Sequence, residues 1–361
     1  MQQEIYQFPI EGAPVQCTEI KSGHINRTYL ITMDTGVRYI LQWINGYVFP
    51  NIDALMGNVA AISAFLREHD SGGMSMISYI DTLDGRHYYD DGKGGAWRLY
   101  RFVENSVCHQ NCEGPEDFYE SARGFGGFQY ALRDFPAGEL EETIVNFHNT
   151  PDGYGKVRAA IEKNASGRAE SARREIDYIL DREERACVLH RMRERGELPV
   201  RVTHNDTKIN NVLLDENTGK ALCVIDLDTV MPGLAAYDFG DAIRFGASTA
   251  KEDEPNLSRV HFDLDMFRIF TRGFVEACPS LTQAELDALA QGAYTMTIEC
   301  GMRFLTDYID GDVYFSTDRE GQNLDRCRTQ LKLIDEMEQH WDELTAIVRQ
   351  ETARAAECAS V

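Results

Sequence analysis

The sequence predicts an α+β fold of two lobes, a small β-rich N-terminal lobe and a larger, mostly helical C-terminal lobe. Short runs of strand character fill the beginning of the chain, whereas helical periodicity dominates its second half. The length of 361 residues also exceeds the usual size of one domain. We therefore expect the small lobe to span residues 1–103 and the large lobe to span residues 104–361.

The first elements are expected to be strands, because β-branched and aromatic residues gather in short runs between polar turns. The three runs are Val15–Ile20, Thr28–Met33 and Arg38–Trp43. A helix is expected over Asn51–Asp70, where apolar residues recur at helical spacing and Asn51 or Asp53 can cap the first turn. A further strand over Ala96–Val103 leads into the polar stretch Glu104-Asn105-Ser106, which we interpret as the hinge between the lobes.

Beyond the hinge most of the chain has helical periodicity. An apolar stripe runs from Phe118 to Leu132, and one continuous helix is expected over Glu175–Arg195. From Phe262 to about Ala355 the chain is expected to be helical, with breaks at Pro279 and around Gly311. The aromatic and Met side chains of this last segment are expected to form the core of the large lobe.

A polar loop interrupts these helices. It has the sequence His204-Asn205-Asp206-Thr207-Lys208-Ile209-Asn210-Asn211. The loop follows a strand-like Leu198–Val202 and precedes a predicted hairpin, Asn211–Leu214 and Lys220–Ile225, with turn residues 215–219 between its strands. The spacing H-x-D-x-x-x-x-N is that of a kinase catalytic loop.

In such a loop the Asp orients the acceptor hydroxyl and can take its proton, and the Asn binds the metal. Asp206 is therefore the predicted catalytic base and Asn211 a predicted metal ligand. Asp226, which directly follows the second hairpin strand, is the second predicted metal ligand. The cofactors that this pattern implies are ATP and Mg²⁺.

The tripeptide Asp238-Phe239-Gly240 matches the one that carries the metal-binding Asp of protein kinases, but it lies well beyond the hairpin. We predict that Asp238 instead caps a helix N-terminus or braces the catalytic loop, because a carboxylate there accepts backbone N–H groups that have no other partner.

The nucleotide is expected to contact the small lobe and the hinge. Gly23 and His24 lie in the first connection, where a kinase has its phosphate-covering loop, although three glycines are normal there. Gln42 occupies the position of the usual phosphate-binding Lys, and the following helix offers no Glu before Glu68 to pair with such a Lys. Adenine is expected at the backbone of the hinge. The residues predicted there are Phe102, Val103 and Glu104.

Composition narrows the classes of partner. The formal net charge of −23 argues against nucleic acid and anionic membranes, which are bound through clustered Lys and Arg, and favours a small-molecule acceptor. The N-terminus lacks the basic and apolar regions of a signal peptide, so a cytoplasmic location is expected. The nine cysteines are then expected to be reduced thiols. The sequence leaves open whether the chain is a monomer or a small homo-oligomer.

These motifs resemble those of the aminoglycoside-phosphotransferase and choline-kinase group, and within it most of all the bacterial N-acetylhexosamine 1-kinases. The most specific stretches are Gly23-His24-Ile25-Asn26, Arg201 to Lys208, Ile225 to Thr229, Asp238 to Ser248 and Glu299 to Leu305. The resemblance implies a bilobal protein-kinase-like fold. It further implies an ATP-dependent enzyme that phosphorylates the anomeric hydroxyl of N-acetylglucosamine or N-acetylgalactosamine.

The resemblance also implies a set of sugar-binding residues in the matching segments. They are Lys208, Asp228, Arg244, Arg303 and Tyr314. Some of these residues have a purely structural alternative: Asp228 could order its loop, Arg244 could pair with Asp241 or Asp238, and Arg303 could pair with Asp307. Two other functions stay open, a kinase of the same fold for choline, homoserine, another sugar or an aminoglycoside, and a nucleotide-binding regulator without transfer activity.

Overall fold

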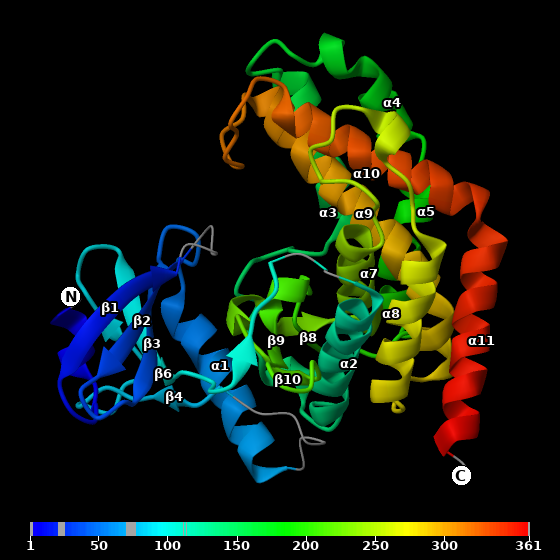
Figure 1. The fold of residues 1–361 in the computed structure, drawn as a ribbon. Coiled ribbons are helices and arrows are strands. Elements are labelled where there is room, and N and C mark those ends of the chain that lie inside the picture. The colour runs from blue at the N-terminus through cyan, green and yellow to red at the C-terminus, as the bar shows by residue number, and fades with distance from the viewer. Residues whose placement is uncertain (1–2, 21–25, 70–76, 111, 113, 360–361) are drawn as a thin grey trace.

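The computed structural model describes residues 3–20, 26–69, 77–110, 112 and 114–359. A β-sheet forms the N-terminal part and helices form most of the C-terminal part, which confirms the predicted α+β class (Figure 1). We call residues 3–101 the small lobe and residues 106–359 the large lobe. No helix in the described ranges is both long and apolar enough to cross a membrane.

The small lobe is built on a six-stranded antiparallel sheet of order β1-β2-β3-β6-β4, in which β5 also pairs with β6. Its strands are β1 (Pro14–Ile20), β2 (Arg27–Met33), β3 (Arg38–Asn45), β4 (Tyr79–Ile80), β5 (Tyr89–Asp90) and β6 (Gly95–Arg101). The three predicted N-terminal strands are thereby confirmed. In the pairing of β3 with β6, Gln42 lies opposite Arg98.

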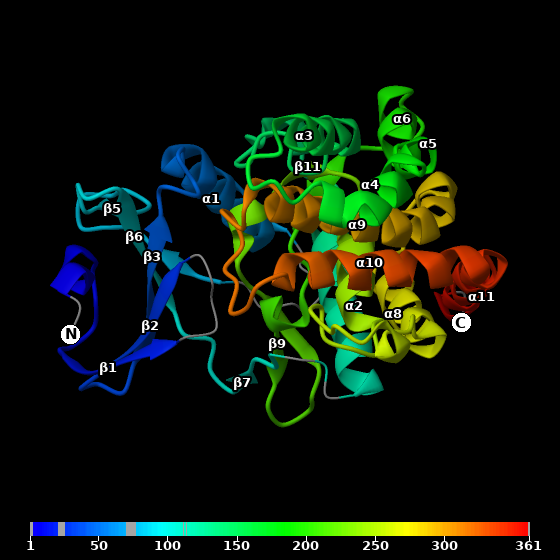
Figure 2. The same ribbon diagram turned by 90° about the horizontal axis from the view of Figure 1, so that it is seen from above.

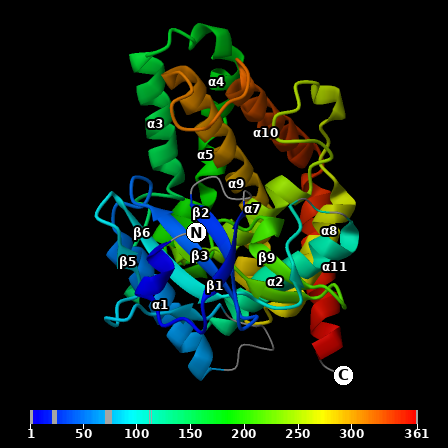
Figure 3. The same cartoon turned by 60° about the vertical axis from the view of Figure 1, so that its left-hand side comes forward.

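Helix α1 (Ile52–Glu68) begins as predicted, because the Asn51 side chain accepts a hydrogen bond from the backbone N–H of Ala54. The helix lies between the sheet and the helical part of the molecule (Figure 2). Its buried apolar residues join the large core of the C-terminal helices, and Phe65 contacts Phe135 edge to face. The strands around Tyr39 and Leu41 form a separate, smaller core with the N-terminal residues. Figure 3 shows the sheet in front of the large lobe.

The large lobe contains ten α-helices in the described residues. They are α2 (Pro115–Ala131), α3 (Thr150–Lys163), α4 (Arg173–Leu180), α5 (Glu183–Ala186), α6 (Val188–Glu194), α7 (Ala235–Gly246), α8 (Leu264–Ala277), α9 (Gln283–Asp310), α10 (Gln322–Gln339) and α11 (Trp341–Ala359). The breaks predicted at Pro279 and Gly311 are confirmed. The 3-10 turns are η1 (Gln3–Gln7), η2 (Ala137–Glu139), η3 (Glu170–Ala172), η4 (Ile209–Asn211), η5 (Leu227–Thr229) and η6 (Leu257–Arg259).

The prediction of one helix over Glu175–Arg195 is wrong, because the segment divides into α4, α5 and α6. Arg182 lies at the first bend. Its guanidinium donates two hydrogen bonds to the Glu338 carboxylate of α10, at 3.1 and 2.8 Å, and it stacks on the ring of Tyr178. Such contacts with a distant element fix the bend, and helical periodicity does not encode them.

Short strands frame the polar loop of the large lobe. They are β7 (Ser106–Val107), β8 (Arg201–Thr203), β9 (Val212–Asp215), β10 (Ala221–Val224) and β11 (Met231–Gly233). The hairpin of β9 and β10 is confirmed. The strand predicted over Leu198–Val202 begins only at Arg201, because its partner β11 pairs with residues 201–203 alone.

Helices α7 and α9 cross at two glycines. A Cβ atom on Gly240 would lie 2.2 Å from the backbone oxygen of Gly292, and one on Gly292 would lie 2.2 Å from the backbone oxygen of Ala236. The two backbones can approach this closely only because both positions lack a side chain. The crossing fixes the distance between the polar side chains that α7 and α9 contribute to the site.

Candidate active site

The polar loop between β8 and β9 is held by a buried carboxylate of α7. Asp238 accepts hydrogen bonds from the backbone N–H groups of His204 (2.9 Å) and Asn205 (2.8 Å), and from Gln129 Nε2 (2.6 Å). This confirms that Asp238 braces the loop. Asn205 has a positive φ of 63°, and its side-chain amide donates to the Thr229 oxygen at 2.8 Å. The chain thus turns sharply just before Asp206.

Both carboxylate oxygens of Asp206 have partners. Oδ1 lies 2.8 Å from Lys208 Nζ, and Oδ2 accepts from Asn211 Nδ2 at 3.1 Å. The same Asn211 nitrogen also donates to the backbone oxygen of Asp206 at 2.8 Å. Burial lowers the pKa of Lys208, but the pair with Asp206 outweighs this effect, so its pKa is raised and the side chain stays charged at neutral pH.

Asp226 lies beside Asn211 at the end of the hairpin, because the N–H of Ile225 donates to the Asn211 oxygen at 2.9 Å. Asp226 has a positive φ of 60°. Within the described ranges, no residue donates a hydrogen bond to its carboxylate. Burial, then the nearby Asp228 and Asp206 carboxylates, raise the pKa of Asp226 to about 7. The Asp226 carboxylate is therefore available to bind a cation.

The donor set at this place fits Mg²⁺, which prefers oxygen ligands. Asn211 donates its amide nitrogen to Asp206, so its Oδ1 atom faces no described donor and can act as a ligand beside Asp226. Among the described residues, no group of three or more His, Cys, Asp or Glu side chains forms a complete metal site. Mg²⁺ usually needs only one or two protein carboxylates, because phosphate oxygens and water complete its coordination.

The next acidic residue, Asp228, is buried and bound by the small lobe. Asn26 Nδ2 donates to Asp228 Oδ2 at 2.6 Å. Arg98 Nη1 lies 2.5 Å from Asp228 Oδ1, as an ion pair and not as an aligned hydrogen bond. Gln42 is bound by the same arginine: its Oε1 accepts from Arg98 Nε (2.9 Å) and Nη2 (2.6 Å), while its Nε2 donates to Thr28 Oγ1 (3.0 Å).

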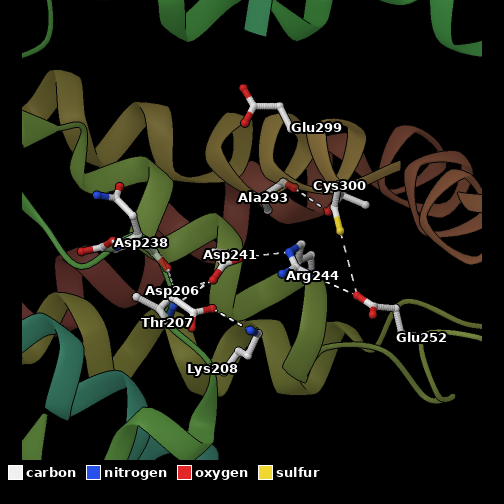
Figure 4. Close-up of polar contacts among 12 residues, drawn as sticks. Asp206, Thr207, Lys208, Asp238, Asp241, Arg244, Glu252, Ala293, Glu299 and Cys300 are labelled. Atoms are coloured by element: carbon white, nitrogen blue, oxygen red, sulfur yellow. Dashed lines mark hydrogen bonds and ion pairs between the residues drawn. The ribbon is translucent and has the colours of Figure 1, made fainter. Parts of the chain in front are cut away.

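A second chain of polar contacts leads from the loop along α7 to Glu252, which also contacts Cys300 of α9 (Figure 4). The Thr207 N–H donates to Asp241 Oδ2 at 2.8 Å, and Asp241 Oδ1 accepts from Arg244 Nε at 2.8 Å. Arg244 Nη1 donates to Glu252 Oε1 at 3.0 Å. Burial alone would raise the pKa of Asp241, but Arg244 and Lys208 lower it to about 2. Arg244 thus forms the ion pair with Asp241 that we named as a structural alternative to a sugar-binding role.

Arg303 of α9 does not pair with Asp307. Its guanidinium lies 5.5 Å from the ring centre of Phe147, and its buried Nε atom has no described partner. The Asp307 carboxylate instead accepts the backbone N–H groups of the following loop. These are the N–H groups of Val313, Tyr314 and Phe315, at 2.9, 2.8 and 3.0 Å. The loop is therefore fixed, while the side chain of Tyr314 is 71% exposed.

Two buried residues near these arginines were not predicted. His148 Nδ1 contacts Glu299 Oε2 at 3.0 Å, and the other Glu299 oxygen accepts from Thr150 Oγ1 at 2.6 Å. His148 Nε2 is buried and has no partner among the residues described. His148 and Glu299 lie 151 positions apart in the sequence, so no local motif signals their contact.

A model of the phosphotransferase enzyme family, known as APH, matches residues 16–275. This chain belongs to that family. The phosphotransferase resembles an aminopropanol kinase associated with a microcompartment, at 17% identity and a TM-score of 0.64, with 95% of this chain and 97% of the other covered. It also resembles a choline kinase of Cryptosporidium parvum (14%, TM-score 0.56, 93% and 92% covered). A third match is an aminoglycoside phosphotransferase of Alicyclobacillus acidocaldarius (13%, TM-score 0.55, 98% and 95% covered). At these identities the structural likeness concerns the fold.

The segment predicted to be the hinge of this phosphotransferase is partly occupied by its own contacts. The N–H of Phe102 donates to the Arg38 oxygen at 3.1 Å, and the Val103 oxygen accepts from Ser106 Oγ at 2.6 Å. Glu104 forms an ion pair with Arg38. The N–H of Val103 has no partner among the described residues, so it can donate a hydrogen bond to the adenine of a nucleotide.

The two other nucleotide-binding predictions, Gly23 and His24, lie outside the described residues. Gln42 is described, and its amide is used within the sheet, so its contact with a phosphate stays a prediction. The phosphotransferase also has a buried cation in this region, Arg98, which sequence analysis missed.

Proposed function

We propose that this phosphotransferase uses ATP and Mg²⁺ to phosphorylate the anomeric hydroxyl of N-acetylglucosamine and N-acetylgalactosamine, giving the sugar 1-phosphate. The observation that carries the reaction class is Asp206, oriented by Lys208 and Asn211 beside the Asp226 carboxylate, which has no hydrogen-bond donor among the described residues. The acceptor is inferred from the sequence resemblance. The proposal includes the division into a nucleotide-binding lobe of residues 1–103 and a sugar-binding lobe of residues 104–361.

Asp206 accepts a hydrogen bond from the acceptor hydroxyl, directs the oxygen at the phosphoryl group and takes the proton as the new bond forms. An anomeric hydroxyl is more acidic than an ordinary alcohol, so a carboxylate of modest basicity is sufficient. Lys208 keeps Asp206 in place and adds positive charge close to the transferred group. Asn211 and Asp226 would hold Mg²⁺, which supplies charge neutralisation on the phosphates of ATP when it is bound.

The lining on the acceptor side supports a neutral, polyhydroxylated acceptor. Lys208, Arg244 and the buried Nε of Arg303 are all donors, and His148 Nε2 is a further buried group without a described partner. Donors of this kind match sugar hydroxyls and an acetamide carbonyl. The exposed ring of Tyr314 is proposed to cover the sugar. Both Asp228 oxygens contact the small lobe, so this residue would bind the sugar through its remaining lone pairs.

The test is an acceptor panel with Mg-ATP. N-acetylglucosamine, N-acetylgalactosamine, glucose, galactose and choline are incubated separately, ADP release is followed, and products are identified by phosphorus NMR. We expect a sugar 1-phosphate from the two acetamido sugars. ADP release with choline alone would keep the phosphotransferase chemistry and refute the sugar. No release with any acceptor, together with tight ATP binding, would indicate a nucleotide-binding regulator.

A further inference from the structure

The small lobe contains a buried arginine that points toward the predicted metal site. The side chain of Arg98, on β6, is 1% exposed. Two of its nitrogens donate to Gln42 Oε1, and a third lies 2.5 Å from Asp228 of the large lobe. Its guanidinium also lies 5.6 Å from the ring centre of Tyr79. A charge buried this deeply is retained only where its partners are fixed.

The position of Arg98 explains why Gln42 is not a lysine. The two residues are direct partners across β3 and β6. An ammonium group at position 42 would meet the guanidinium of Arg98, whereas the Gln42 amide oxygen accepts two of its N–H groups. The positive charge of this sheet is therefore carried by Arg98 on β6, whereas kinases usually carry it on a lysine of β3, the neighbouring strand.

The other partner of Arg98 belongs to the loop that follows the predicted metal ligand. Asp228 lies two residues after Asp226, and its carboxylate is held by Arg98 and by Asn26 of the small lobe. Farther along the same loop, the backbone oxygen of Val230 accepts from Asn58 Nδ2 of α1 at 3.1 Å. The small lobe thus fixes the loop at two points directly after Asp226.

We propose that Arg98 is a positioning residue for the metal site: through Asp228 it couples the nucleotide-binding sheet to the loop that carries Asp226. The proposal rests on the metal role proposed for Asp226 and is independent of the acceptor. Arg98 and Asn26 hold the Asp228 carboxylate, which leaves Asp226 as the carboxylate of this loop without a described partner. Without Arg98, the loop would lose its ion pair with the sheet two residues after Asp226, and Asp226 would no longer be held in position.

The test measures cation binding without an acceptor. Mn²⁺ is titrated into the protein in the presence of AMP-PNP, and free Mn²⁺ is followed by electron paramagnetic resonance. We expect R98M to weaken Mn²⁺ binding by at least about tenfold, the size of effect seen when outer partners of metal ligands are lost. R98K keeps the charge but not the fork to Gln42 and Asp228, so it should recover only part of the affinity. D226N should abolish binding.

Two further variants separate positioning from simple charge compensation. R98M/D228N removes both buried charges, so its unfolding temperature should return toward that of the wild type while Mn²⁺ binding stays weak. R101M is the matched control, because Arg101 lies on the same strand and makes an exposed ion pair with Glu11. Wild-type Mn²⁺ affinity in R98M, or its full recovery in R98M/D228N, would refute the proposal. If R98M fails to fold, R98K and the double variant decide.

The outcome is separable from the proposed sugar specificity. A wrong acceptor changes the products of the acceptor panel but leaves binding of Mn²⁺ and AMP-PNP intact. A wild-type protein that binds no Mn²⁺ with AMP-PNP would refute both the metal role of Asp226 and the role of Arg98.

Discussion

Asp206 is held from two sides, by an ion pair with Lys208 and by a hydrogen bond from the side-chain amide of Asn211. The Asn211 side chain serves two partners at once, since its nitrogen binds Asp206 and leaves its oxygen for a cation. A single amide therefore sets the distance between the predicted base and the predicted metal. Position 211 is therefore sensitive to any substitution that lacks the amide nitrogen or the amide oxygen of Asn211.

We predict that D206N lowers kcat by about 100- to 10,000-fold, the usual contribution of a positioned general base. The affinity for Mg-ATP should change little, because the carboxylate is assigned to the acceptor side. Initial rates at saturating substrates and calorimetric titration with AMP-PNP measure the two quantities. D134N, which alters an exposed ion pair with Arg133, is the control and should behave as the wild type. A kcat of D206N near that of the wild type would refute the assignment.

Asp241 should make the stability of the protein depend on pH in acid. Its pKa is lowered to about 2 in the folded state, against 3.8 for an ordinary Asp, so its charge stabilises the fold above pH 4. This contribution, on the order of 2 kcal/mol at neutral pH, should be lost as the pH falls through about 2. We predict that the difference in unfolding free energy between the wild type and D241N shrinks from pH 7 to pH 3 in urea titrations. A difference independent of pH would contradict this.

The central site residues could largely be predicted from local sequence, whereas the residues that surround them could not. Asp206 and Asn211 lie in one loop, and the hairpin register brings Asp226 beside them, so spacing alone predicts their proximity. Arg98 and His148 act through partners on distant elements, Asp228 and Glu299. Their contacts depend on cross-strand pairing and on packing between helices, which a single sequence does not reveal.

At the scale of elements, α7 and α9 form the frame of the proposed acceptor side. α7 carries Asp238, Asp241 and Arg244, while α9 carries Glu299 and Arg303. The crossing at Gly240 and Gly292 sets how far apart these side chains stand. The ends of α9 were predictable from Pro279 and Gly311, but the bends between α4, α5 and α6 were not, because partners such as Glu338 impose them.

We predict that G292A destabilises the protein by about 1–3 kcal/mol despite the better helix propensity of Ala, because the added methyl group meets the backbone of α7. The displacement of α7 should also move Asp238 and lower kcat. Chemical denaturation and initial rates measure both effects. G155A is the matched control: Gly155 lies in α3, and a methyl group added there would meet no atom within 4 Å, so that change should be neutral or stabilising. Equal stability of G292A and G155A would contradict the close crossing.

At the scale of the whole molecule, the two lobes share a core. The apolar face of α1 belongs to the same cluster as the helices of the large lobe, and Asn58 of α1 bonds the backbone oxygens of Glu141 and Val230. The sheet keeps a smaller cluster of its own. If the small lobe moves relative to the large lobe, there are two possibilities. Either α1 moves together with the sheet, or α1 stays on the large lobe and the chain bends at both ends of this helix.

We predict that the lobes unfold in a single transition, although chains of this length often unfold in steps. W341F leaves Trp43 and Trp97 as the tryptophans of the chain, and both belong to the sheet. Their fluorescence reports the small lobe, while far-ultraviolet circular dichroism reports mainly the helices of the large lobe. In urea the two signals should change at the same midpoint. Separate midpoints would show that the shared core does not couple the lobes.

The position of α1 has a consequence for recombination with relatives. The hinge is the obvious crossover point in the sequence, but a chimera joined there would set a foreign α1 against Phe135 and the loop around Val230. A workable exchange would transplant the strands and leave the resident α1 in place, with junctions on both sides of that helix. In natural recombination as in protein engineering, the unit that can be exchanged between related proteins is then the sheet, and not the whole small lobe.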